Sequence, residues 1–195
     1  MLQLTLADPV VPGPRLLLPA VESALLLGLL VADPRRIHRD SRDLRLLALL
    51  LDGVIAVVNA AALVSLVRAL LLGGPLTGRQ LLAAAAGVWL TNVVVFALAY
   101  WELDRGGPLA RAGARTGPSH PDLVFPQDTN PELAPAGWQP VFVDYLFVSL
   151  TAATAFSPTD TMPLTPRAKL LLGAQSLISL LTVGLVAARA VNILN

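Results

Sequence analysis

The chain has 195 residues, of which 55% are hydrophobic and 14% are charged. Soluble domains carry about 25% charged residues, so this composition, together with a mean hydropathy of +0.68, excludes a soluble globular domain and predicts a surface that faces lipid. The net charge of +1 and the scattered basic residues argue against nucleic-acid binding. The absence of cysteine excludes disulfides and thiolate metal sites. By size, residues 1–195 form a single transmembrane domain.

A hydrocarbon core about 30 Å thick is crossed by roughly 20 apolar residues of helix, and four stretches of the chain approach that length. They are Leu16–Ala32, Leu46–Val67, Leu81–Trp101 and Ala168–Val191. We therefore predict an all-α polytopic membrane protein with four transmembrane helices, three of them within residues 1–101. No basic cluster precedes the first stretch, which argues against a cleaved signal peptide.

The region between the third and fourth stretches has a different character. Residues 102–140 are rich in Pro and Gly and carry charges of both signs, which predicts an irregular aqueous loop. Val141–Phe156 is apolar but short for a span, and it leads into a Ser-Pro-Thr-Asp turn. We predict a short re-entrant helix here. Irregular backbone at membrane depth is tolerated where protein buries it or where it lines a watery cavity.

The order of features in residues 141–195 is more specific than any one of them. A short apolar helix is followed by a Thr-containing turn, an acidic residue, a Pro-x-Thr step and a long helix. This order resembles the pore module of tetrameric potassium-channel-type proteins: pore helix, filter, Asp, Pro-x-Thr step and inner helix. The residues that carry the resemblance are Asp144, Tyr145, Thr151, Thr154, Asp160, Pro163, Thr165, Pro166, Lys169, Leu170, Leu171, Ala188 and Arg189. The resemblance implies a homotetramer around a central ion path.

The segment in the filter position departs from the family's Thr-Val-Gly-Tyr-Gly-Asp pattern, because it is one residue longer and contains no glycine. It consists of Thr154, Ala155, Phe156, Ser157, Pro158, Thr159 and Asp160. Glycine reaches φ > 0 without a steric cost, whereas Pro158 fixes φ at about −65° and removes a hydrogen-bond donor. We therefore expect no carbonyl cage. The alternatives are a wider mouth lined by Thr, Ser and Asp oxygens, with weak potassium/sodium selectivity, and a non-conducting packed turn.

Polar residues recur along one face of the last helix. Gln175, Ser179 and Thr182 follow an i, i+4, i+7 spacing and so share a face that avoids lipid. We predict that this face lines the pore, although hydrogen bonding between helices gives the same pattern. Gly184 is a candidate gating hinge, with close helix packing as the alternative. Asn92, in the third stretch, is predicted to bond between helices.

Two carboxylates interrupt the apolar stretches. Asp52 shares a face of the second stretch with Asn59, and Glu22 lies in the first. An intramembrane carboxylate indicates a functional site by default, so Asp52 is a candidate for a proton or ion relay. The favoured alternative is an ion pair or hydrogen bond that fixes helix packing, because no second acid lies in that stretch. Neither a trusted metal-ligand spacing nor a catalytic or phosphate-binding motif is present, so we expect no enzyme activity, metal or cofactor.

The basic residues and the channel resemblance favour different membrane layouts. In the channel layout both termini are cytoplasmic, and the loops at 33–45 and 102–140, which hold most of the basic residues, lie outside. A five-span layout with an external amino terminus places those loops inside, as the positive-inside rule prefers. We adopt four spans plus the re-entrant helix and keep five spans as the alternative.

Taken together, these patterns predict a channel-like integral membrane protein, expected in the plasma membrane, that conducts monovalent cations passively through a homotetrameric pore. Asp160 concentrates cations at the mouth of this pore. The expected partners are membrane lipid, monovalent cations and further copies of the chain. The alternatives are a non-conducting membrane scaffold or accessory subunit, and a small transporter that uses Asp52 and Glu22.

Overall fold

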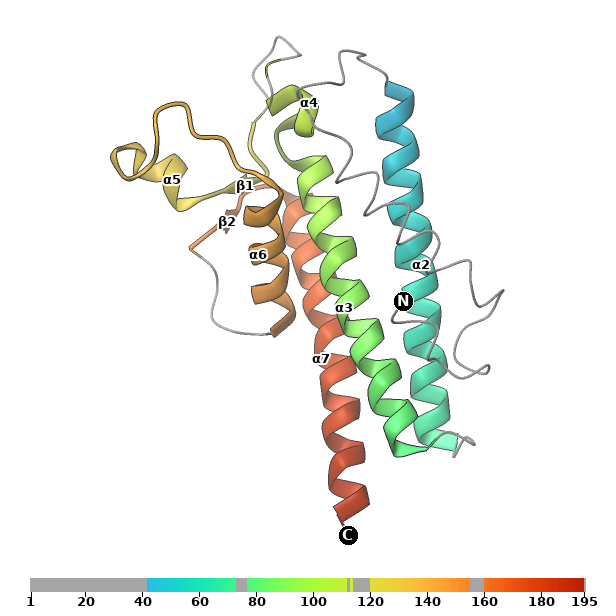
Figure 1. The fold of residues 1–195 in the computed structure, drawn as a ribbon. Helices are drawn as coiled ribbons and strands as arrows, with labels where there is room; N and C mark the ends of the chain where they lie inside the picture. Colours follow the sequence, from blue (N-terminus) through green and yellow to red (C-terminus); the bar gives the residue numbers. More distant parts are fainter. Residues whose placement is uncertain (1–41, 73–76, 112, 114–119, 155–159, 195) are drawn as a thin grey trace.

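Three long helices dominate the computed structural model, which describes residues 42–72, 77–111, 113, 120–154 and 160–194. These helices are α2 (Arg42–Leu72), α3 (Gly78–Leu103) and α7 (Pro166–Leu194) (Figure 1). Each contains a stretch long and apolar enough to cross a membrane, as expected for an integral membrane protein. These stretches are Ala48–Leu72, Gly78–Gly106 and Pro166–Ala188. The first predicted span, Leu16–Ala32, lies outside the described residues.

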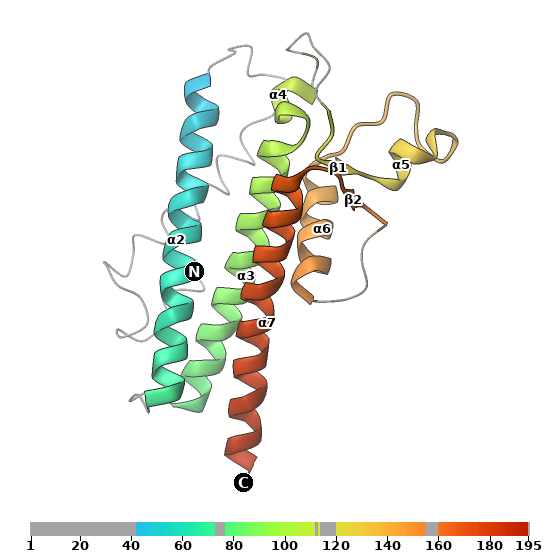
Figure 2. The ribbon, with the colours of Figure 1, turned by 180° about the vertical axis from the view of Figure 1, so that it is seen from behind.

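The central helix of the bundle is α3, which has α2 on one side and α6 and α7 on the other (Figures 1 and 2). It begins with a capping box. The Thr77 hydroxyl accepts a hydrogen bond from the Gln80 N–H at 3.3 Å, and the Gln80 side chain accepts one from the Thr77 N–H at 2.9 Å. Ala84 and Ala85 of α3 pack against Leu66 of α2. Small side chains at this contact allow the two helix backbones to approach closely.

The short helix α6 (Phe142–Thr154) has 13 residues. At a rise of 1.5 Å per residue its length is about 20 Å, well short of the roughly 30 Å hydrocarbon core. The described helix is therefore shorter than the hydrocarbon core is thick.

Helices α6 and α7 start at the same end of the bundle and run side by side in the same direction (Figures 1 and 2). Tyr145 and Ala168, near the two helix starts, belong to one apolar cluster. Further along, Gln175 of α7 bonds to Ser149 of α6. The chain therefore returns from the end of α6 to the end of the bundle at which α6 began.

The chain between α3 and α6 is more ordered than the irregular loop predicted for residues 102–140. It contains η2 (Asp104–Gly106), α4 (Pro108–Arg111), β1 (Leu123–Val124), α5 (Pro126–Thr129) and η3 (Pro131–Leu133). Strand β1 pairs antiparallel with β2 (Met162–Pro163), with Leu123 opposite Pro163 and Val124 opposite Met162. We call the described residues 104–111 and 120–141 the cap.

An aromatic cluster holds the cap on the helices. The Phe125 ring lies edge-to-face on Tyr145 of α6, with ring centroids 5.4 Å apart, and on Trp138, with centroids 5.9 Å apart. At the end of α3 the chain reverses through Gly106 and Gly107, whose φ angles of 79° and 93° suit a residue without Cβ. Composition suggested a loop, but these few large apolar residues give the cap its own small core.

Candidate functional site

Polar side chains from α3, α6 and α7 meet inside the bundle around Gln175. Gln175 is fully buried, with 0% of its surface exposed. Its Oε1 accepts a hydrogen bond from the Tyr100 hydroxyl at 2.6 Å, and its Nε2 donates to the carbonyl oxygen and the Oγ of Ser149 at 2.8 and 2.6 Å. The Ser149 hydroxyl donates to the Val93 carbonyl at 2.6 Å. A continuous chain of hydrogen bonds therefore joins the three helices.

Asn92 of α3 extends these contacts along α7. Its Nδ2 donates to Ser179 Oγ at 2.8 Å and to the Gln175 carbonyl at 3.3 Å, which confirms the predicted interhelical role. The Asn92 Oδ1 has no hydrogen-bond partner among the described residues. We call Tyr100, Ser149, Gln175, Asn92 and Ser179 the buried network.

The polar face of α7 is covered by the chain itself. Gln175, Ser179 and Thr182 share a face, as their spacing predicts, but all three are buried inside the chain. Thr182 donates to the Ile178 carbonyl of its own helix at 2.7 Å. Periodicity shows which residues share a face and not which neighbour covers that face, so pore lining by these residues stays a prediction. Helix–helix hydrogen bonding, the alternative explanation, describes Gln175 and Ser179.

The carboxyl end of α6 lies partway along α3 and α7, and side chains of these two helices cap it. The last carbonyls of a helix have no partner within it, and here two receive a donor from outside. Trp89 Nε1 of α3 donates to the Ala153 carbonyl at 3.3 Å, and Ser176 Oγ of α7 donates to the Ala152 carbonyl at 3.2 Å. Trp89 and Ser176 each lie near the middle of an apolar span. Helix α6 therefore ends beside the middle of two apolar spans, with protein donors on two of its last carbonyls.

Thr154 and Asp160 flank the predicted filter segment. Thr154 ends α6, and its hydroxyl lies 2.9 Å from the Leu150 carbonyl and 3.2 Å from the Thr151 carbonyl, so it closes the last turn of the helix. Asp160 is exposed and precedes β2 by two residues. The predicted filter residues Ala155, Phe156, Ser157, Pro158 and Thr159 lie outside the described residues.

The other singled-out residues differ in their surroundings. Asp52 is buried on α2, and its Oδ1 has no hydrogen-bond partner among the described residues. Asn59, one heptad further along α2, donates to the Val88 carbonyl of α3 at 3.2 Å and so contributes to packing. Gly184 is exposed, and a Cβ added to it would meet no atom within 4 Å, so packing within the chain does not require glycine there. Glu22 lies outside the described residues.

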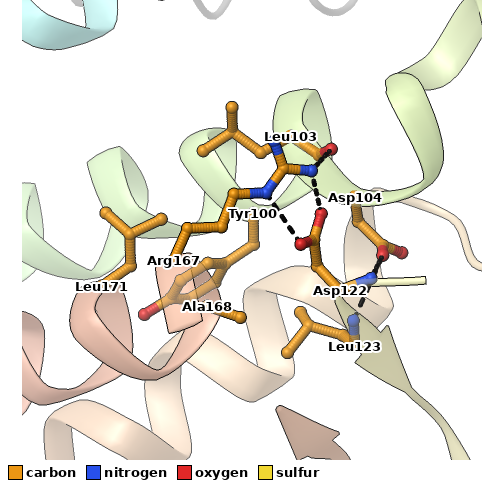
Figure 3. Close-up of a pocket in the computed structure, with 8 residues that line it drawn as sticks. All are labelled: Tyr100, Leu103, Asp104, Asp122, Leu123, Arg167, Ala168 and Leu171. Atoms are coloured by element: carbon orange, nitrogen blue, oxygen red, sulfur yellow. Dashed lines mark hydrogen bonds and ion pairs between the residues drawn. The ribbon is translucent and has the colours of Figure 1, made fainter. Parts of the chain in front are cut away.

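Two buried carboxylates organise the cap, and the sequence analysis singled out neither. Asp122 faces Arg167 at the start of α7: Arg167 Nε donates to Asp122 Oδ1 at 2.7 Å, and a second nitrogen bonds Asp122 Oδ2 and the Leu103 carbonyl (Figure 3). Thr165 also donates to Asp122. Burial alone would raise the pKa of Asp122, but the hydrogen bonds from Arg167 and Thr165 and the charge of Arg167 lower it below its ordinary value.

Asp104 is the second of these carboxylates and joins three segments of the chain. Its Oδ1 accepts hydrogen bonds from the backbone N–H groups of Asp122 and Leu123 at 2.7 and 3.2 Å. Its Oδ2 accepts one from the Tyr145 hydroxyl of α6 at 2.7 Å. Arg111 donates to the Trp101 and Asp104 carbonyls at 2.9 and 2.7 Å, and so caps the end of α3. The aspartates therefore fix the cap relative to the starts of α6 and α7.

Within the described part of the chain, no group of three His, Asp or Glu side chains is placed to hold a metal ion. The pocket lined by Tyr100, Leu103, Asp104, Asp122, Leu123, Arg167, Ala168 and Leu171 is small, and the Asp122–Arg167 pair lies across it (Figure 3). Comparison of the chain with family models, with curated proteins and with solved structures finds no match.

Proposed function

We propose that the protein is the subunit of a channel-like homotetramer in the plasma membrane that conducts monovalent cations passively. The observation that supports this function is α6, which ends near mid-depth beside α7 and is followed by a return of the chain to the same end. A half-length helix, a return and a long helix are the parts that the resemblance of residues 141–195 implies. The carboxyl end of a helix carries partial negative charge, which favours a cation.

The proposed ion path lies between copies of the chain and not inside one copy. Inside, the buried network fills the space between α3, α6 and α7. The opposite face of α7 is exposed and largely apolar: Leu177, Leu180 and Leu181 are 62%, 67% and 56% exposed. Ser176 lies on this exposed face beside the end of α6. Four such faces around an axis would form a path with four α6 ends directed toward it, and Gly184 on the same face remains the candidate hinge.

The chemistry proposed for the filter follows from the missing glycines. Side-chain oxygens of Thr154, Ser157 and Thr159 would contact ions that keep part of their hydration shell, so the path discriminates weakly between potassium and sodium. The carboxylates of Asp160 from four copies would raise the cation concentration at the mouth.

A second function, a non-conducting membrane scaffold or accessory subunit, also has an observation in its favour. Gln175, Ser149 and Ser179 are satisfied within one chain, and Trp89 and Ser176 cap the end of α6. A purely structural helix needs the same contacts. The third alternative, a small transporter, has one favourable observation, the buried Asp52 oxygen without a hydrogen-bond partner.

Ion flux through liposomes that contain the purified protein separates these functions. We expect potassium and sodium flux, and we expect Asp160→Asn to reduce it most at low ionic strength, because salt screens the field over about 10 Å at 0.1 M. The matched control is Glu132→Gln, which removes an exposed acid of the cap. Folded tetramers without flux favour the scaffold. A clean monomer in detergent and in nanodiscs removes the pore, and strong potassium selectivity contradicts the proposed filter chemistry.

A further inference from the structure

The helices divide the chain into two ends. At one end α2 begins, α3 ends, and α6 and α7 begin, and the cap lies at this end beside α3, α6 and α7 (Figures 1 and 2). At the opposite end α2 ends, α3 begins and α7 ends. We call these the cap end and the far end. The start of α7 lies at the cap end because α6 and α7 begin at the same end of the bundle.

Basic residues gather at the cap end. Arg42 and Arg45 lie in the first turn of α2, and Arg105 and Arg111 lie in the cap. In the sequence, Arg35, Arg36 and Arg39 lie within seven residues before the start of α2. Arg167 and Lys169 in the first turn of α7 add to them. The far end has only Arg68, Arg79 and Arg189, and Arg15 before the first apolar stretch adds at most one more.

We infer that the cap end faces the cytoplasm, so that α6 enters the membrane from the cytoplasmic side. Basic residues in short loops and near helix ends are retained in the cytoplasm, and acidic residues contribute little to this bias. The cytoplasmic leaflet also carries anionic lipids that attract basic segments at the membrane surface. The cap end is therefore the surface that fits an anionic headgroup layer.

Ion pairs within the cap do not weaken this orientation. Arg105 is paired with Asp104 and Asp128, and Arg167 is paired with Asp122. The rule counts basic residues and is not a rule of net charge. The cap end therefore has six described basic residues and the far end has three.

This orientation is the reverse of the one expected from the channel resemblance, which put the loops at 33–45 and 102–140 outside. It rests on the helix arrangement and the basic residues, and is independent of whether the protein conducts. If the proposed function also holds, Asp160 lies at a mouth that opens to the cytoplasm.

Single-cysteine labelling tests the orientation directly, because the natural chain contains no cysteine. Glu132→Cys places a thiol at an exposed position of the cap, and Thr77→Cys places one at an exposed position of the far end. In intact cells we expect a membrane-impermeant maleimide to label Thr77→Cys and to leave Glu132→Cys unlabelled. After the membrane is permeabilised, both variants should be labelled, which is the control for accessibility.

Labelling of Glu132→Cys in intact cells, with protection of Thr77→Cys, would overturn the inference. A second measurement avoids the capping position Thr77. Alkaline phosphatase fused after Asn195 should be active, because the enzyme matures outside the cytoplasm and α7 ends at the far end. An inactive phosphatase fusion, with a fluorescent green fluorescent protein fusion at the same point, would contradict the orientation. Neither readout depends on ion flux, so the orientation and the proposed function fail separately.

Discussion

The hydrogen bonds of Gln175 give a quantitative test of which face of α7 packs inside the chain. Gln175→Met keeps the length of the side chain but removes its bonds to Tyr100 and to the two Ser149 oxygens. Hydrogen bonds between membrane helices contribute about 0.6 kcal/mol each on average, so the three together contribute about 2 kcal/mol. The Tyr100 hydroxyl, buried and left without its acceptor, adds a penalty of about 1–3 kcal/mol. We expect the free energy of unfolding to fall by about 3–5 kcal/mol.

A double-mutant cycle with Tyr100→Phe isolates the contribution of the Tyr100–Gln175 hydrogen bond. Tyr100→Phe alone removes one hydrogen bond and should cost about 1 kcal/mol. In the double variant no hydroxyl is left unpaired and the shared bond is lost only once, so the loss should be smaller than the sum of the single losses by about 2–4 kcal/mol. The matched control is Leu177→Met, which changes an exposed residue two positions away on the same helix. The control should change stability by less than about 0.5 kcal/mol.

Unfolding by titration with sodium dodecyl sulfate in mixed micelles, followed by tryptophan fluorescence, measures these free energies. The packing of Gln175 against α3 and α6 is refuted if Gln175→Met is as mild as Leu177→Met and shows no coupling to Tyr100→Phe. In that case the polar face of α7 is available to line a pore. A large and coupled loss of stability with unchanged ion flux supports the buried arrangement and a path that lies elsewhere.

Two further predictions concern the end of α6 and the cap. Trp89→Phe removes the donor to the Ala153 carbonyl and should lower the free energy of unfolding by about 1 kcal/mol in the same titration. The control for lost ring area is Trp101→Phe, because the Trp101 ring packs on Phe142. Equal losses in the two variants would contradict the capping of α6 by Trp89. The pKa of Asp122 is lower in the folded protein than its ordinary value, so its ion pair stabilises the fold fully above pH of about 4 and loses this effect as the pH falls through the lower folded value. Asp122→Asn should therefore reduce stability at pH 7 and flatten the pH dependence of stability below pH of about 4, whereas Glu132→Gln should leave both as they are. Circular dichroism melts measure this dependence. If stability still falls in the same way below pH of about 4 in Asp122→Asn, Asp122 is not the titrating group.

The long helices could be predicted from the sequence because lipid requires a simple pattern. An apolar run of sufficient length is nearly always a helix in a membrane, since its backbone polar groups must pair within the segment. The runs that begin at Leu46 and Leu81 mark helices that start at Arg42 and Gly78. The difference of a few residues arises because each helix continues beyond its apolar part, and α3 gains its first turn from the Thr77 capping box. Hydropathy therefore predicts the part of a helix that lies in lipid, and capping residues predict where the helix begins.

The surroundings of the predicted site residues could not be predicted in the same way. The spacing of Gln175 and Ser179 indicates a shared face, but their partners Tyr100, Asn92 and Ser149 come from two other helices. No local pattern contains that pairing. The cap was missed for a related reason: Asp104 meets Asp122 and Tyr145 across separations of 18 and 41 residues, through bonds to one backbone N–H and one hydroxyl. A charged residue directly after an apolar run is the one local signal, and it is common at helix ends.

The cap also explains how the short helix α6 is held in the bundle. The start of α6 is held where the Tyr145 hydroxyl bonds to Asp104. The returning chain is held to the same cap by the β1–β2 pairing and by the Leu164 N–H, which donates to the Asp122 carbonyl at 2.8 Å. The start of α6 and the chain that follows Asp160 are therefore both attached to the cap, and Trp89 and Ser176 donate to the last carbonyls of α6.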